Sequence, residues 1–98
     1  MGEPVSKPTN EANDQQDMAI LEEVFVRRKV QDAKWGGNRN LPAELWHVIL
    51  SEEVGEVAHA ILEHDMANLR DELLDVAAVA AVIIQWIDNC AGHPGLTE

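Results

Sequence analysis

The sequence predicts an all-α protein, an antiparallel bundle of three to four helices that is completed by oligomerisation. Three observations lead to this prediction. Apolar residues recur at helical spacing in three segments, and no stretch shows the alternation typical of strands. Glycine, asparagine and proline mark the breaks in this pattern. The third segment is apolar on nearly every side, which is typical of a helix that is buried all round.

The first helix is expected at about residues 17–33. Met18, Leu21 and Phe25 recur there at helical spacing, and acidic residues precede basic ones, the order that the helix dipole favours. Residues 1–16 hold two prolines and polar residues without apolar periodicity. We therefore expect them to form a disordered tail.

A loop and a second helix are expected next. Residues 34–42 contain two glycines and two asparagines, which predicts a loop. Pro42 fits the first position of the second helix, since its missing N–H has no helical partner there. The apolar stripe that follows extends this helix to about His64.

The third helix is expected to follow after a short turn. Asp65 or Asn68 can cap it, and its apolar residues continue to Ile87. Glycine and proline then stop the helix. The sequence thus predicts one helical domain over residues 17–90 and a C-terminal tail over residues 91–98.

The size of the chain predicts a partner subunit. A protein of 98 residues forms one small domain, which buries a smaller share of its surface than a large domain does. A third helix that is apolar on every side offers more apolar surface than such a subunit can cover. We therefore expect an obligate homodimer or homotetramer.

The charge of the chain excludes several classes of partner. Eighteen acidic residues against seven basic ones give a formal net charge of −11, which repels nucleic acids and anionic membrane surfaces. The longest uncharged run, residues 76–87, is short of the roughly 20 residues that span a bilayer. The lone Cys90 cannot form an internal disulfide, and the first residues show no secretory signal pattern. We therefore expect a cytoplasmic protein without nucleic-acid or membrane partners.

Acidic residues form two motifs with i, i+3 spacing. Glu52, Glu53 and Glu56 lie on the second helix, and Glu72 and Asp75 lie on the third. At about 100° per residue, the two members of each spaced pair project within roughly 60° of each other. Two such pairs on facing helices would form a cluster of four carboxylates. In an acidic chain, however, most such pairs merely coat a solvated face.

The direction of these acids favours the cluster. On a helical wheel Glu53 lies between Ile49 and Trp46, inside the apolar stripe, and Glu72 shares its face with Val76 and other apolar residues. Burying an unpaired carboxylate is costly, and carboxylates brought together repel one another. No basic residue lies within either motif, so bound cations are the simplest counter-charge.

The donor atoms indicate which metal would bind. Carboxylate oxygens suit hard cations, magnesium or manganese first and calcium next. Di-iron bundles also need Glu-x-x-His pairs on two helices, and within the acidic motifs only Glu56 and His59 match that spacing. Iron is therefore disfavoured.

The two motifs together resemble those of a known family. Glu-Glu-x-x-Glu over residues 52–56, a spacer of about 15 residues and Glu-x-x-Asp over residues 72–75 are similar to the MazG-like nucleoside triphosphate pyrophosphatases, relatives of the dimeric all-helical dUTPases. The Lys34-Trp35-Gly36 turn strengthens the resemblance. It implies a helical dimer, or a dimer of dimers, whose acidic residues hold magnesium on a triphosphate.

The resemblance also implies roles for the acidic residues. The ligands of Mg²⁺, which Mn²⁺ could replace, would be Glu53, Glu56, Glu72 and Asp75. Glu52 and Glu53 would be the catalytic residues, with Glu52 as the general base nearest the attacking water or, alternatively, an outward-facing acid. The family's reaction is attack at the α-phosphorus, which gives a nucleoside monophosphate and pyrophosphate. Deoxynucleotides are expected among the substrates, and the expected role is control or housecleaning of nucleotide pools.

Four further residues are candidate substrate contacts. Lys34 and Arg39, in the glycine-containing loop, could bind phosphate oxygens, as could Arg27, Arg28 and Lys29 of the first helix. Ordinary surface cations are the alternative. Trp35 either stacks on the base or covers the core. Asn89 either reads a base edge or caps the third helix.

The alternative function is non-catalytic. The acids would then bind divalent cations, or keep a helical oligomerisation module soluble. The chain lacks an EF-hand loop pattern, which counts against a calcium sensor. In a hydrolase the two acidic pairs must converge, whereas in such a module they would face separate solvent.

Overall fold

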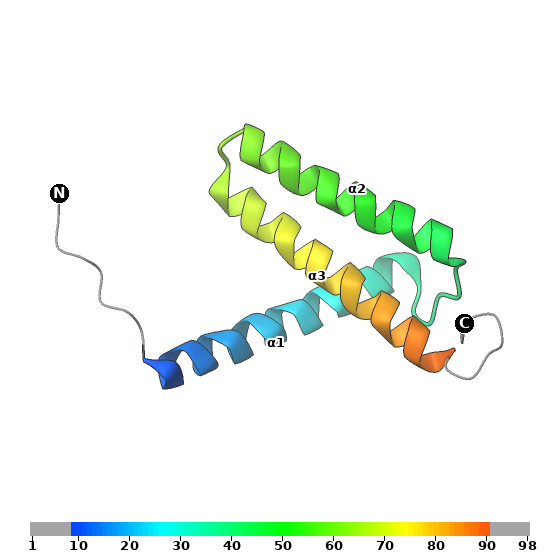
Figure 1. Cartoon of the computed structure of the whole chain (residues 1–98), viewed down its shortest axis with the longest axis horizontal. Coiled ribbons are helices and arrows are strands. Elements are labelled where there is room, and N and C mark those ends of the chain that lie inside the picture. Colours follow the sequence, from blue (N-terminus) through cyan, green and yellow to red (C-terminus); the bar gives the residue numbers. More distant parts are fainter. Residues whose placement is uncertain (1–8, 91–98) are drawn as a thin grey trace.

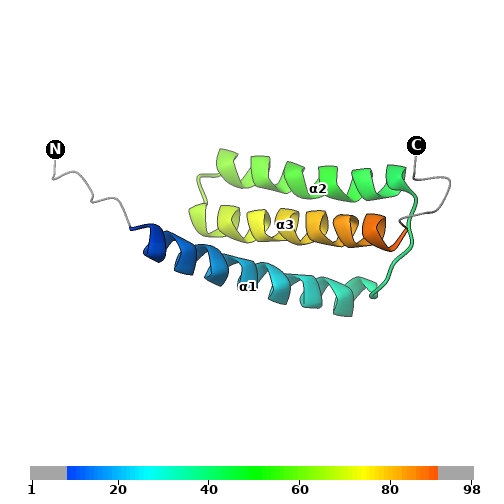
Figure 2. The same ribbon diagram turned by 60° about the horizontal axis from the view of Figure 1, so that its bottom comes forward.

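The computed structural model describes residues 9–90 and is helical in three segments, with no strand among these residues. The helices are α1 (Asn10–Trp35), α2 (Ala43–Leu62) and α3 (Met66–Asn89). α2 and α3 form an antiparallel hairpin, and α1 crosses α3 obliquely (Figure 1). α3 lies between the other two helices (Figure 2). The predicted all-α class is confirmed.

α1 begins several residues earlier than the sequence predicts. Its first residue is Asn10, because the side chain of Thr9 acts as the N-cap and accepts a hydrogen bond from the backbone N–H of Ala12 at 3.0 Å. The first turns of α1 are therefore helical and not part of the expected N-terminal tail. The remainder of that tail, residues 1–8, lies outside the described residues, as does the expected C-terminal tail, residues 91–98.

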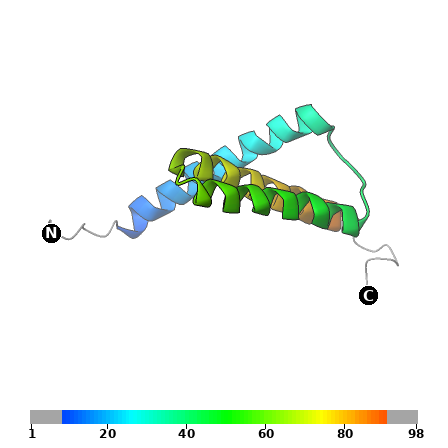
Figure 3. The ribbon, with the colours of Figure 1, turned by 90° about the horizontal axis from the view of Figure 1, so that it is seen from above.

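α1 ends just before Gly36, two residues later than predicted, so Lys34 and Trp35, which were expected in the loop, belong to the last turn of the helix. Gly36 has a φ of 94°, a backbone conformation that side-chain-bearing residues rarely adopt, and its N–H donates to the carbonyl oxygen of Asp32 at 2.8 Å. The last turns of α1 diverge from the hairpin, and the loop up to Pro42 joins α1 to α2 (Figure 3). Pro42 is the N-cap of α2, one position before its first helical residue.

The turn between α2 and α3 settles which residue caps α3. The Asp65 side chain accepts a hydrogen bond from the backbone N–H of Asn68 at 3.0 Å, so Asp65 is the cap and Asn68 lies within the helix. His64, in the turn between the two helices, has a left-handed backbone conformation with a φ of 56°. This turn fixes the antiparallel pairing of α2 with α3.

The core lies mainly between α2 and α3. Trp46 is 1% exposed and packs against Trp86, with 6.3 Å between the ring centroids. The other buried residues are Ala60, Leu74, Ala78, Val79 and Val82. α1 contributes no buried residue, so its apolar side chains add little to this core.

α3 is not buried on every side within one chain, contrary to the expectation. Leu73 (49% exposed), Ile84 (58%) and Ile87 (49%) remain open to solvent. Their separations of 11 and 14 residues return to nearly the same helical angle, so they share one side of α3. Asp71 and Gln85, which contact α1, lie on another side. Two helices cover two sides of α3 and leave the third free.

Among residues 9–90, no helix combines the length and the apolar character needed to cross a bilayer.

Candidate metal centre

The two acidic motifs meet where α2 faces α3. Glu53 of α2 and Glu72 and Asp75 of α3 each offer one carboxylate oxygen, and these oxygens lie within 4.8 Å of one another. Glu53 reaches this position because it lies seven residues from both Trp46 and Ala60, on the buried face of α2. We call these three half-buried residues the acid cluster. One acid of the first motif and both acids of the second thus converge, as a hydrolase requires.

The surroundings of Glu53 and Glu72 disfavour the negative charge of these two carboxyls. Burial raises the pKa of the Glu53 carboxyl above its ordinary value, and the charges of Asp75, Glu72, Glu52 and Glu56 raise it further. Burial also raises the pKa of Glu72, again with Asp75 and Glu56 as contributors. A nearby positive charge would therefore stabilise the ionised form of both carboxyls.

The other two acids of the first motif lie at the edge of this site. Glu56 is exposed and does not belong to the group of three oxygens, although its charge acts on both Glu53 and Glu72. Glu52 is exposed and acts on Glu53. Of the four expected ligands, the structure brings three together and places the fourth beside them.

A basic residue reaches the acid cluster from α1. Arg27 Nη1 donates a hydrogen bond to Asp75 Oδ1 at 3.0 Å and another to the carbonyl oxygen of Asp71 at 3.2 Å, and Nη2 donates to Asp71 Oδ1 at 3.1 Å. Bound cations are therefore not the sole counter-charge, which corrects the sequence-based expectation. A helical wheel compares residues within one helix, so it does not reveal which residue of α1 lies against α3.

The acid cluster suits a hard divalent cation. Its donors are carboxylate oxygens, the ligands that Mg²⁺ and Mn²⁺ prefer. Arg27 also pairs with Asp71, so its guanidinium neutralises only part of the charge of the three carboxylates, and a net negative charge remains when all are ionised. A divalent cation would balance this charge, and Glu53, Glu72 and Asp75 would hold it.

Three of the candidate substrate contacts lie near the α1–α2 loop. Lys34 Nζ lies 5.0 Å from the ring centroid of Trp35, and both side chains are exposed. Trp35 is 60% exposed, so it does not cover the core of the described chain. The Arg39 guanidinium lies 5.1 Å from the ring centroid of the buried Trp46.

The fourth candidate contact, Asn89, is the exposed last residue of α3. The ends of α1 and α3 and the loop lie at the same end of the bundle (Figure 2). Sequence reasoning did not predict that Trp86 Nε1 donates to Asn40 Oδ1 at 2.9 Å, which ties the loop to α3. None of the four candidates belongs to the acid cluster.

Comparisons with known proteins give one match. A family model described as the MazG nucleotide pyrophosphohydrolase domain matches residues 42–92. The matched segment contains α2, α3 and both acidic motifs. Searches of curated proteins and of solved structures found no match.

Proposed function

Since the chain belongs to the MazG nucleotide pyrophosphohydrolase family, we propose that it hydrolyses nucleoside triphosphates, including deoxynucleotides, with the help of Mg²⁺. The products would be a nucleoside monophosphate and pyrophosphate, and the role would be control or housecleaning of nucleotide pools. The observation that carries the proposal is the convergence of Glu53, Glu72 and Asp75 from two facing helices. Mn²⁺ is the expected substitute for Mg²⁺ because it takes the same ligands.

The acids have distinct roles in the proposed reaction. Glu53, Glu72 and Asp75 hold the cation, and Glu56 adds a fourth carboxylate from the edge of the site. When bound, Mg²⁺ neutralises phosphate oxygens and lowers the pKa of a coordinated water. Glu52 accepts the proton of the water that attacks the α-phosphorus. The bond from that phosphorus to the bridging oxygen then breaks, and pyrophosphate leaves.

The proposed substrate contacts come from the end of the bundle near the loop. Lys34 and Arg39 would bind phosphate oxygens, because both carry a positive charge. Trp35 presents an exposed ring that can stack on a base. Asn89 is exposed at the end of α3 and can form hydrogen bonds with a base edge.

Pyrophosphate release tests this function directly. The full chain would be assayed with the common ribonucleoside and deoxyribonucleoside triphosphates, in Mg²⁺, in Mn²⁺ and in chelator. We expect release in either metal and none in chelator. Glu53→Gln should nearly abolish it, whereas the control Glu63→Gln, which removes an exposed acid at the end of the same helix, should not. Metal binding without release from any nucleotide would instead support the non-catalytic cation-binding module.

We also propose that the chain forms a homodimer or homotetramer through the free side of α3. Leu73, Ile84 and Ile87 supply the centre of this surface. Val54 (51% exposed) and Ile61 (55%) extend the exposed apolar surface onto α2. An identical copy offers a self-complementary apolar surface of the kind that symmetric dimers use.

Light scattering across a range of concentrations tests the assembly. The parent chain should be oligomeric at micromolar concentration, and Ile84→Lys should shift it toward the monomer. Leu21→Lys is the control, because it puts the same charge on an exposed apolar residue of α1 (59% exposed). A monomeric parent, or dissociation by Leu21→Lys alone, would contradict the proposed interface.

A further inference from the structure

α1 is attached to α3 largely by polar side chains. It has no buried residue, and its hydrogen bonds to α3 come from residues 23–31. Arg70 of α3 forms an ion pair with Glu23 of α1 through both terminal nitrogens, at 2.9 Å and 2.6 Å. One turn further along α1, Arg27 forms the contacts with Asp71 and Asp75 described above. Two arginine forks therefore join the same pair of helices.

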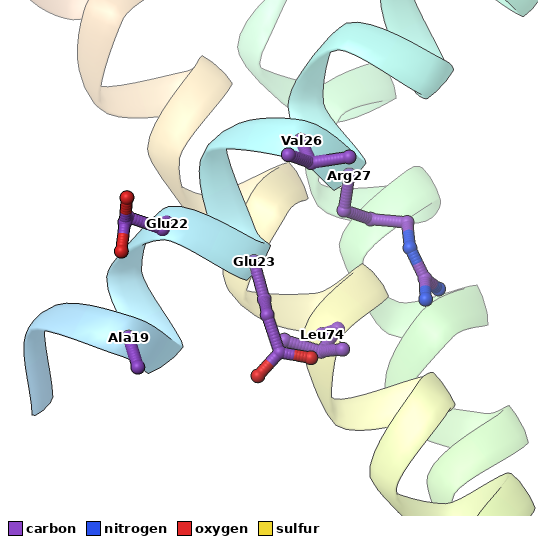
Figure 4. Close-up of a pocket in the computed structure, with 6 residues that line it drawn as sticks. All are labelled: Ala19, Glu22, Glu23, Val26, Arg27 and Leu74. Carbon is purple, nitrogen blue, oxygen red and sulfur yellow. The ribbon is translucent and has the colours of Figure 1, made fainter. Parts of the chain in front are cut away.

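Figure 4 shows Glu23 and Arg27 projecting from α1 beside Leu74 of α3. A groove of about 420 Å³ lies between the helices here, lined by Ala19, Glu22, Glu23, Val26, Arg27 and Leu74. Arg27 is thus the lining residue that also reaches the acid cluster, through Asp75.

The Arg27 fork fixes Asp75 more closely than a single ion pair would. Its two terminal nitrogens contact a carboxylate oxygen of each aspartate and a backbone oxygen of α3. The guanidinium is planar and rigid, so three acceptors on one helix determine its orientation. The side chains of Arg27 and Asp75 are only 25% and 24% exposed, so solvent screens their contact less than it screens a surface pair.

We propose that Arg27 is a positioning residue for the metal centre. Its fork holds Asp75 where that carboxylate can share a cation with Glu53 and Glu72. A carboxylate has two oxygens, so Asp75 can accept a hydrogen bond from Arg27 and still ligate a metal. The inference rests on the proposed function, because it assigns Arg27 a role in the same site.

Charge and geometry make opposite predictions for this residue. As a positive charge beside the acid cluster, Arg27 repels an incoming cation, so its charge alone weakens metal binding. As a fork that orients Asp75, it strengthens metal binding. Arg27→Lys separates the two effects, because lysine keeps the charge but cannot bridge three acceptors with a rigid plane.

Mn²⁺ affinity of the full chain, measured by electron paramagnetic resonance of the free ion, tests the inference without turnover. We expect Arg27→Lys to weaken Mn²⁺ binding by about 10–100-fold, the range typical when a group that orients a metal ligand is lost. Circular dichroism would verify that the variant is folded. The nucleotide assay should show a larger Mn²⁺ requirement for the variant and partial recovery at saturating Mn²⁺.

Arg70→Lys is the matched control. It makes the same chemical change in the neighbouring fork between the same two helices, whose carboxylate partner, Glu23, does not belong to the acid cluster. Its Mn²⁺ affinity should equal that of the parent. Equal affinities of Arg27→Lys and parent would overturn the positioning role and leave the metal site intact. Equal weakening by both variants would also overturn it, because general loosening of α1 would then be the cause. A parent chain that binds no Mn²⁺ would overturn the proposed metal site as well.

Discussion

Replacing Glu53 by glutamine should stabilise the metal-free protein while removing its activity. The substitution keeps the volume of the side chain and removes one charge from a group of carboxylate oxygens within 4.8 Å of one another. Two like charges at that distance repel by about 1 kcal/mol even at the dielectric constant of water. Glu53 faces two of them, Glu72 and Asp75, and Arg27 offsets part of the repulsion. We therefore expect the free energy of unfolding to rise by about 1–2 kcal/mol.

Thermal unfolding at pH 7 in chelator, followed by circular dichroism at one protein concentration, measures this change. For a domain of this size each kcal/mol raises Tm by about 4–8 °C. High salt should reduce the difference from the parent because it screens the repulsion. Excess Mg²⁺ should stabilise the parent more than the variant, because ligand binding to the folded state adds to its stability.

Asp75→Asn provides the contrast. The sequence alone predicts the same stability change for both amide variants, since both relieve repulsion. The structure separates them, because Asp75 accepts a charge-assisted hydrogen bond from Arg27, whereas Glu53 accepts none from the residues that the structure describes. Asp75→Asn should therefore be less stable than Glu53→Gln in chelator. If Glu53→Gln leaves Tm unchanged at low salt and retains parental Mg²⁺-dependent turnover, the reasoning fails on both counts.

Three further predictions follow from individual residues. The folded-state pKa values of Glu53 and Glu72 lie above the ordinary value of 4.5, so the stability of the metal-free chain should fall as pH rises through that region. The higher Tm of Glu53→Gln relative to the parent should therefore vanish in acid, where the parent carboxyl is protonated. A Tm difference that does not depend on pH would contradict this. Trp35→Ala should weaken nucleotide binding in calorimetry with little change in helicity, whereas a loss of several kcal/mol of stability with intact binding would show a structural role. Asp65→Ala should lower stability by about 1 kcal/mol in chemical denaturation, because the Asn68 N–H loses its cap, and an unchanged midpoint would refute it.

The parts of the fold that sequence reasoning predicts are those decided by neighbouring residues. Asp65 lies three residues before Asn68, so the cap of α3 could be proposed from the sequence. Gly36 ends α1 for an equally local reason. Thr9 is also a local signal, because a threonine can cap a helix. The residues that follow it are polar and lack apolar periodicity, so the sequence predicts a later start of α1 than the structure shows.

The candidate metal centre also has a part that the sequence predicts and a part that it does not. The position of Glu53 between apolar residues of α2 predicts that it turns toward α3, and it does so. The partner of Asp75 lies 48 residues earlier in the chain, on a helix whose contact with α3 depends on side-chain forks. Periodicity gives the face of each helix but not the register of one helix on another, so Arg27 could not be assigned to Asp75 from the sequence.

The segment that matches the family model does not contain every residue of the candidate metal centre. The match begins at Pro42 and includes all the carboxylates of the acid cluster, whereas Arg27 lies before it, on α1. Without α1 the same carboxylates would have three formal negative charges; with Arg27 in place, part of this charge is already neutralised. The motifs thus determine which oxygens can bind a metal. α1 determines how much of their charge is left for it, and through Asp75 it also influences where one of those oxygens lies.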